Sequence, residues 1–182
     1  MTKLYTRTGD DGYAGRLGEG RLPKNHPLFD AIGAVDEATA ALGVARAYSI
    51  SMLTRTLLLG VQKDLYHLMA ELSATKENAG RFRRINEKSV QWLEEEIDSL
   101  QTQVDLPIEF IVPGDSIAGA HIATARTLVR RAERQVAGLY NSADIENVHL
   151  LRYLNRLSSL CFILELMENE ASGKPKPTLA KE

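Results

Sequence analysis

The stretch of residues 125–139, ARTLVRRAERQVAGL, constrains the fold of this chain more than any other. At about 100° per residue, its larger apolar side chains share one helical face, which predicts a helix that packs inward along that face. These side chains are Val129, Ala132, Val136 and Leu139. We expect the helix to begin near Ser116, directly after the breaker pair Pro113 and Gly114.

A second stripe of charged residues follows one edge of that apolar face. Arg126, Arg130 and Glu133 are spaced i, i+4 and i+7 along it, whereas Arg131 and Arg134 point further outward. The cations are all arginine, whose rigid fork of donors suits phosphate and carboxylate and stays charged when partly buried. From this helix alone, an anion site and a solvated or subunit-contacting arginine face are equally compatible interpretations.

Four further segments repeat apolar residues at helical spacing. They span about residues 28–49, 52–74 and 86–103, and a last segment that begins between 144 and 149, with Asp144 as an expected N-cap, and ends near 169. Residues 75–84 are polar and basic and predict a loop, and residues 107–114 predict a short extended stretch. The fold class predicted is all-α: one bundle of five long antiparallel helices joined by short loops.

The two ends of the chain differ from this bundle. Residues 1–27 lack helical or sustained strand periodicity, and glycine recurs there at positions 9, 12, 15, 18 and 20. Such a segment can present backbone N–H groups to an anion, although a flexible tail is the alternative. Its phosphate- or metal-compatible side chains are Thr6, Arg7, Thr8, Asp10, Arg21 and Lys24. We therefore expect an anion-binding loop at 1–27, the bundle at 28–170 and a disordered, proline- and lysine-rich tail at 171–182.

Several single residues raise questions about chemistry. Asp36 falls inside the apolar stripe of the first helix, where a carboxylate needs a cation or a donor. Asp64, His67 and Glu71 form one Asp-x-x-His pair with a glutamate one turn later, but a di-iron bundle needs two Glu-x-x-His motifs. A solvated or interface patch is the favoured interpretation there. Cys161 stands in an apolar run and predicts a buried structural thiol.

Charge and hydropathy restrict the partners. The chain has 22 Lys and Arg against 24 Asp and Glu, a net charge of −2 at pH 7. This balance argues against general nucleic-acid binding and limits any anion site to a local group of arginines. Met1 leads directly into polar sequence, and no stretch approaches eighteen apolar residues. These features predict a cytoplasmic protein without a membrane partner.

Seven segments together resemble the PduO-type ATP:cob(I)alamin adenosyltransferase family, and they occur in that family's order. They are YTRTGDDG at 5–12, RLPK at 21–24, AIGAVDEATAALG at 31–43, LYHLMAELSAT at 65–75, FIVPG at 110–114, ARTLVRRAER at 125–134 and LRYLNRLS at 151–158. The leading TGD-x-G motif, and RRAER followed some twenty residues later by LNRLS, are the most specific parts of the resemblance.

The resemblance implies a five-helix, ferritin-like bundle that assembles as a homotrimer with ATP held between adjacent subunits. The implied activity transfers the 5′-deoxyadenosyl group of ATP to the cobalt of reduced cobalamin and releases triphosphate, with Mg²⁺ carried by ATP. A reductase and an adenosylcobalamin-dependent enzyme would be further partners. A catalytically weak member that binds ATP as a sensor, or that delivers the cofactor, is the alternative. A helical protein that binds nucleic acid through its arginine face is a second one, which the acidic balance opposes.

The same likeness assigns the site residues. The ATP-binding set would be Thr6, Arg7, Thr8, Gly9, Lys24, Arg130, Arg131, Glu133, Arg134 and Asn155. The catalytic set would be Arg130, Arg126, Asp36 and Phe110. In that set, Asp36 would pair with Arg126 to support the site and the subunit contact, and Phe110 matches the aromatic that presses on the lower corrin face and excludes an axial ligand. The chain departs from the family pattern at Thr39, His67, Asp115 and Ser159.

Overall fold

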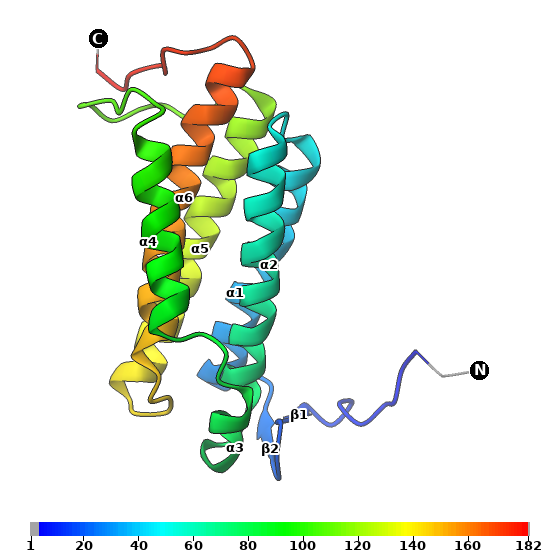
Figure 1. Ribbon diagram of the computed structural model, residues 1–182. Helices are drawn as coiled ribbons and strands as arrows, with labels where there is room; N and C mark the ends of the chain where they lie inside the picture. Colours follow the sequence, from blue (N-terminus) through cyan, green and yellow to red (C-terminus); the bar gives the residue numbers. More distant parts are fainter. Residues whose placement is uncertain (1–3, 182) are drawn as a thin grey trace.

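The computed structural model describes residues 4–181, and that part of the chain is mainly helical, as predicted (Figure 1). The helices are α1 (Pro27–Tyr48), α2 (Met52–Ser73), α3 (Lys76–Phe82), α4 (Glu87–Gln101), α5 (Ile117–Asn141) and α6 (Val148–Ala171). The strands are β1 (Tyr13–Gly15) and β2 (Arg21–Pro23). Residues 1–3 of the expected loop and residue 182 of the expected tail lie outside the described residues.

The long helices are aligned side by side along one axis (Figure 1). Helix α1 packs against α2 and α5, and α6 packs against α5, α4 and, less extensively, α2. The expected antiparallel arrangement does not extend to α4 and α6, which run in the same direction (Figure 1). Their C-terminal ends meet, since Ile111 after α4 pairs with Leu179 after α6. The reason is the order of the helices. α5 lies between α4 and α6 in the sequence and runs antiparallel to both, so α4 and α6 are parallel to each other.

The apolar face predicted for α5 is confirmed. Val129, Ala132 and Val136 are fully buried and Leu139 is almost so, within one core shared by the five long helices. Each fully buried valine or leucine side chain contributes about 1.5–3 kcal/mol relative to exposure, so the core is the main source of stability. Cys161 lies in the same core, as predicted, and its burial raises the pKa of the thiol to about 12.

Three short elements were not expected from the sequence. Strands β1 and β2 pair antiparallel within the glycine-rich loop, and α3 occupies part of the segment predicted as a loop. No residue of α3 or of either strand is buried. Apolar periodicity records burial, so elements without a buried face leave no such signal. The hairpin is fixed to the end of α2 by the Leu17 N–H, which donates to the Ser73 carbonyl at 2.8 Å.

A buried polar cluster connects the end of α2, the start of α4 and the start of α6. Asn147, rather than Asp144, is the N-cap of α6 and accepts from the His149 N–H at 3.1 Å. Its side-chain amide donates to both Glu71 carboxylate oxygens at 3.1 Å and to the Ile85 carbonyl at 2.9 Å. Arg83 also donates to Glu71, at 3.1 Å. One asparagine therefore satisfies a buried carboxylate and caps a helix.

No helix of the described chain is both long enough and apolar enough to cross a membrane.

We expect Asn147→Ala to lower the free energy of unfolding by about 2–4 kcal/mol, because it removes an N-cap and leaves a buried carboxylate with one partner. Asn86→Ala is the matched control. Asn86 caps α4 through an exposed capping box, so its loss is expected to cost about 1 kcal/mol. Urea denaturation of both variants gives the comparison. Equal losses would contradict the role of the buried cluster.

Candidate functional site

Arg21 closes the N-terminal loop. Its guanidinium bonds both carboxylate oxygens of Asp11 at 2.7 Å and donates to the Tyr13 carbonyl at 2.9 Å and to the Thr8 carbonyl. Hydrogen bonding to Arg21 is the main cause that lowers the pKa of Asp11 to about 2. Arg21 was grouped with the phosphate-compatible residues of the loop. In the structure its donors are used to shape that loop.

The remaining loop residues of the predicted ATP set lie close together. The hydroxyls of Thr6 and Thr8 are 2.8 Å apart, and Arg7 between them has φ of 62°, which turns the chain there. Lys24 bends over Gly9, so that a Cβ atom on Gly9 would lie 3.0 Å from the Lys24 ammonium. The Thr and Arg side chains and Lys24 are exposed. The loop thus presents a small concentration of donors to solvent.

The α5 members of the predicted ATP set have different surroundings. Glu133 accepts from the Asn155 amide at 2.9 Å, so these two predicted residues meet. Asn155 in turn accepts from Arg156, which is bonded to Glu94 of α4 at 2.8 Å. Arg131 forms an ion pair with Glu37 of α1.

Arg130 and Arg134 are exposed, and neither has an ion pair or side-chain hydrogen bond among residues 4–181. Their donors are therefore available to an anion.

A groove lies between α4 and α5 with α6 as its floor. Arg126 and Arg130 line one side, Ile97 and Gln101 the other, and Leu106 closes one end; its volume is about 490 Å³. The floor is made by Ser158, Ser159, Phe162 and Ile163. The sequence had singled out Ser159 only as a departure and had not identified Phe162. Ser159 and Phe162 lie on the partly exposed side of α6, next to the stripe of buried leucines from which the helix was predicted.

A second hollow of about 330 Å³ adjoins this groove at the Arg126 and Phe162 side. The segment between α4 and α5 lines it with Phe110, whose side chain is 89% exposed, together with Ile108, Glu109 and Ile111. The Arg126 guanidinium lies 5.9 Å from the centre of the Phe162 ring. The structure therefore brings three predicted residues, Phe110, Arg126 and Arg130, to adjoining hollows with apolar walls and a cationic edge.

Glu165 is a buried acid that the sequence analysis did not identify. It is 1% exposed, and neither carboxylate oxygen has a hydrogen-bond partner among the described residues. Burial raises the pKa of this carboxyl to about 7, while the charge of Arg126 opposes the rise and that of Asp115 adds to it. Glu165 is a single acidic residue among the leucines of α6, so it forms no spaced group of polar residues in the sequence.

The prediction that Asp36 points inward is wrong. Asp36 is exposed, and the structure shows no ion pair between it and Arg126 within the described chain. Val35 and Ala38 are the buried residues at this turn, and Asp36 lies about 100° beyond Val35 around the helix. The apolar stripe of small residues is therefore narrower than the sequence suggested.

The two groups of predicted ATP residues do not meet in one chain. The N-terminal segment extends sideways, away from the helices (Figure 1). No hydrogen bond or ion pair between side chains joins residues 4–24 to α5 in the part of the chain that the structure describes.

Two of the three residues weighed as metal ligands have other partners. Asp64 accepts from the Tyr153 hydroxyl at 2.7 Å, and Glu71 belongs to the buried cluster with Asn147. Within residues 4–181 there is no group of three His, Cys, Asp or Glu side chains arranged to hold a metal ion.

Comparisons with known proteins show which family the chain resembles in sequence and fold. The family model described as Cobalamin adenosyltransferase matches residues 4–168. The corrinoid adenosyltransferase of Citrobacter freundii is 36% identical over 169 residues, covering 92% of this chain and 96% of that protein. Corrinoid adenosyltransferase PduO of Salmonella typhimurium is 36% identical over 167 residues, covering 91% of this chain but 49% of the relative, so the chain spans about half the length of that protein.

A solved structure is similar over nearly the whole chain. It is a variant PduO-type ATP:corrinoid adenosyltransferase from Lactobacillus reuteri complexed with cobalamin and ATP. It has a TM-score of 0.88 and 31% sequence identity, and the match covers 99% of this chain and 97% of that chain.

The raised pKa of Glu165 predicts a pH dependence of stability. The pKa of Glu165 is higher in the folded protein than in the unfolded chain. The free energy of unfolding therefore falls as pH rises from about 4.5 to above 7, because ionisation of this carboxyl favours the unfolded chain. Glu165→Gln is expected to remove this loss, with a gain of about 3 kcal/mol at pH 8 and no gain below about pH 4. Denaturant melts across this range measure it. Glu170→Gln, which alters an exposed acid of the same helix, is the control, and an equal effect in both variants would refute the prediction.

Proposed function

Because the chain belongs to the cobalamin adenosyltransferase family, we propose that it transfers the 5′-deoxyadenosyl group of ATP to the cobalt of a reduced corrinoid and releases triphosphate. The observation that carries the proposal is the pair of adjoining hollows. Phe110 and Phe162 give them apolar walls, and Arg126 and Arg130 give them a cationic edge. An apolar hollow suits a flat macrocycle, and the arginines suit a polyphosphate.

The chemistry needs few groups from the protein. A one-electron reductant converts the Co(II) substrate to Co(I), whose electron pair forms a bond to C5′ of ATP as the C5′–O bond breaks. Triphosphate leaves with the electrons of that bond, so no proton has to move. The protein holds the nucleoside carbon near the cobalt, excludes water, and neutralises charge on the leaving triphosphate. Arg130 is the residue we assign to neutralisation.

We propose that the nucleotide site is completed by a second copy of the chain, in a homotrimer. The support is the separation within one chain of the loop group, Thr6 to Gly9 with Lys24, from the α5 group. A neighbouring subunit would bring the two groups together around one ATP. The exposed donors of Arg130 and Arg134 would then face the loop's hydroxyls and Lys24 ammonium. We place Mg²⁺ on the triphosphate oxygens, where it would add positive charge.

The finer organisation belongs to the same proposal. The five long helices, residues 28–170, form the bundle of the family; residues 1–27 form the ATP-binding arm; and residues 171–182 form a C-terminal tail. We place the protein in the cytoplasm, where a reductase would supply the electron and an adenosylcobalamin-dependent enzyme would receive the product.

The proposed function is tested by mixing cob(I)alamin anaerobically with the protein and MgATP. We expect the Co(I) absorption band to decay into the spectrum of a light-sensitive alkylcobalamin. ATP binding, measured separately by calorimetry, distinguishes the alternatives. Binding without a cobalt–carbon bond would favour the sensor or delivery function and overturn the transferase proposal. Affinity for nucleic acid that falls steeply with salt would favour the arginine-face alternative.

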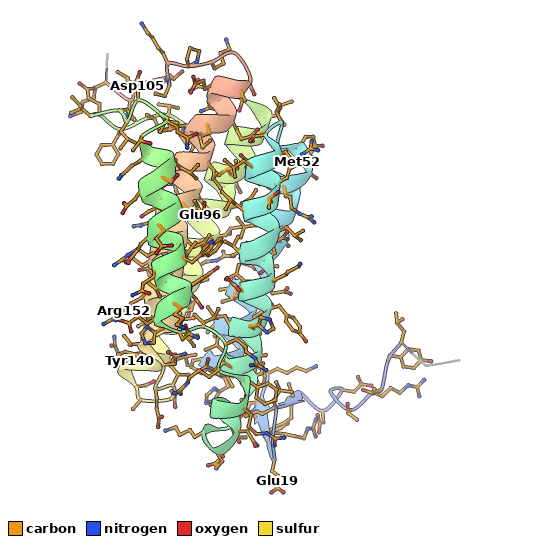
Figure 2. All side chains as sticks on the ribbon, viewed as in Figure 1. Glu19, Met52, Glu96, Asp105, Tyr140 and Arg152 are labelled. Carbon is orange, nitrogen blue, oxygen red and sulfur yellow. The ribbon has the colours of Figure 1, made fainter. Side chains whose placement is uncertain are left out.

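In this assay we expect Arg130→Ala to slow adenosylation roughly 100- to 1,000-fold, because one preorganised donor to developing charge is lost. The bundle should stay folded, since the Arg130 side chain is exposed. Arg152→Ala is the matched control: Arg152 is exposed on α6 near Tyr140, at the end of the bundle opposite Asp105 (Figure 2). Normal turnover of Arg130→Ala would refute its assigned role.

We propose that Asp36 pairs with Arg126 of a neighbouring subunit, since Asp36 is exposed on α1. A homotrimer has three such pairs, one at each interface. Asp36→Asn is then expected to weaken each interface roughly tenfold, the effect of losing one coupled charge pair. Sedimentation at several protein concentrations measures this change. Combining Asp36→Asn with Arg126→Gln should add little to either single change, whereas Asp98→Asn on α4 should have no effect. Fully additive changes would contradict the pairing.

A further inference from the structure

The segment between α4 and α5 carries Phe110 but contains little that holds it. Apart from a single bridge at Ile111, residues 104–115 form no helix or strand, and Ile108 and Phe110 are almost fully exposed. Among residues 4–181, every hydrogen bond of this segment goes to Thr178 or Ala180 in the C-terminal tail. The position of Phe110 therefore depends on the last residues of the chain.

The contacts form a compact unit, which we name the tail clamp: residues 178–180 paired with residues 110–112, together with Asp115. The Val112 N–H donates to the Thr178 carbonyl and the Ala180 N–H donates to the Phe110 carbonyl, both at 2.8 Å. Ile111 and Leu179 form the antiparallel bridge between these two bonds. The backbone is thus held on both sides of Ile111, directly after Phe110.

Asp115 fixes the register of this pairing. Its carboxylate accepts from the Thr178 hydroxyl at 2.6 Å and from the Thr178 N–H at 2.9 Å. These two bonds, the hydroxyl bond first, lower the pKa of Asp115, so the carboxylate stays charged. Asp115 is one of the positions where the chain departs from the family pattern. Its partner Thr178 lies in the tail for which the sequence predicted disorder.

The backbone after α6 directs the tail to this place. Gly173 has φ of 78°, a left-handed conformation that reverses the chain, and the Lys174 N–H then donates to the Asn169 carbonyl at 2.8 Å. Pro175 and Pro177 follow, and their fixed φ reduces the freedom that ordering the tail removes. A composition rich in proline and lysine predicted disorder, whereas these backbone features direct the tail onto the 110–112 segment.

We propose that Asp115 and Thr178 are positioning residues that hold Phe110 over the corrinoid hollow. The inference rests on the proposed function, in which Phe110 occupies the lower corrin face. With the clamp closed, the ring stays beside Arg126 and Phe162, where it keeps an axial ligand from the Co(II) substrate. With the clamp open, Phe110 moves with a segment that has no other hydrogen bonds, an axial ligand enters, and reduction to Co(I) becomes harder. ATP binding involves other residues and stays unchanged.

The test uses the chain of residues 1–182 with cob(II)alamin, MgATP and a one-electron reductant. Thr178→Val keeps the side-chain shape but removes the hydroxyl donor. We expect it to lower both the four-coordinate Co(II) signal, measured by electron paramagnetic resonance, and turnover about tenfold, the effect of losing one hydrogen bond to a charged group. The dissociation constant for ATP should not change. Thr178→Ser restores the donor and should restore both signals, and Lys176→Ala is the control within the tail.

Hydrogen exchange at the Val112 amide reports the clamp independently of activity. It should speed up in Thr178→Val and in a chain that ends at Lys176. A chain in which Val112 exchanges faster but the Co(II) signal and turnover match the parent would overturn the inference. So would a parallel fall in ATP affinity and melting temperature, which indicates a general structural role. Absence of adenosylation in the unsubstituted protein would instead refute the proposed function, and the positioning role with it.

Discussion

The burial of α6 is the constraint on which the rest of the structure depends. Neighbouring helices cover most of its surface, so its buried polar side chains need partners inside the protein, and among the described residues Glu165 is the buried carboxylate of this helix that lacks one. Glu168, fully buried, accepts from the backbone N–H groups of Ile50 and Ser51 at 2.7 and 3.1 Å and so fixes the turn between α1 and α2. Asn169 accepts from the Ser116 hydroxyl at 2.7 Å, at the N-cap of α5.

These hydrogen bonds determine where the groove lined by Arg126 and Arg130 lies. A methyl group at Gly119 would collide with the Asn169 side chain, so α5 can approach α6 closely only because that residue is glycine. The close approach sets Arg126 and Arg130 beside the α6 floor. At the other end of α6, Asn147 joins the linker before α4 to Glu71 of α2, which sets the position of the opposite wall. The groove is therefore a consequence of how the central helix satisfies its buried polar groups.

Apolar periodicity in the sequence predicted the buried faces of the long helices, but not the elements and contacts that leave no periodic pattern. The core face of α5 and its arginine edge followed from spacing alone, because burial of one helical face imposes that spacing. The inward orientation predicted for Asp36 was wrong because the alanines around it are all small, so their pattern does not show where the buried face of the helix ends. The β1–β2 hairpin and α3 have no buried residues, so they left no pattern. The hollow beside Phe110 joins residues from three separated segments, and only tertiary structure brings them together.

The buried thiol has a practical consequence. Cys161 is the single cysteine of the sequence, and its pKa of about 12 keeps it protonated, so it offers no thiolate to an alkylating reagent at neutral pH. The native cysteine therefore does not compete for thiol-specific labels. A cysteine introduced at an exposed position, such as Lys176, would be the one reactive thiol. A spin or fluorescent label could be attached there without first altering the core.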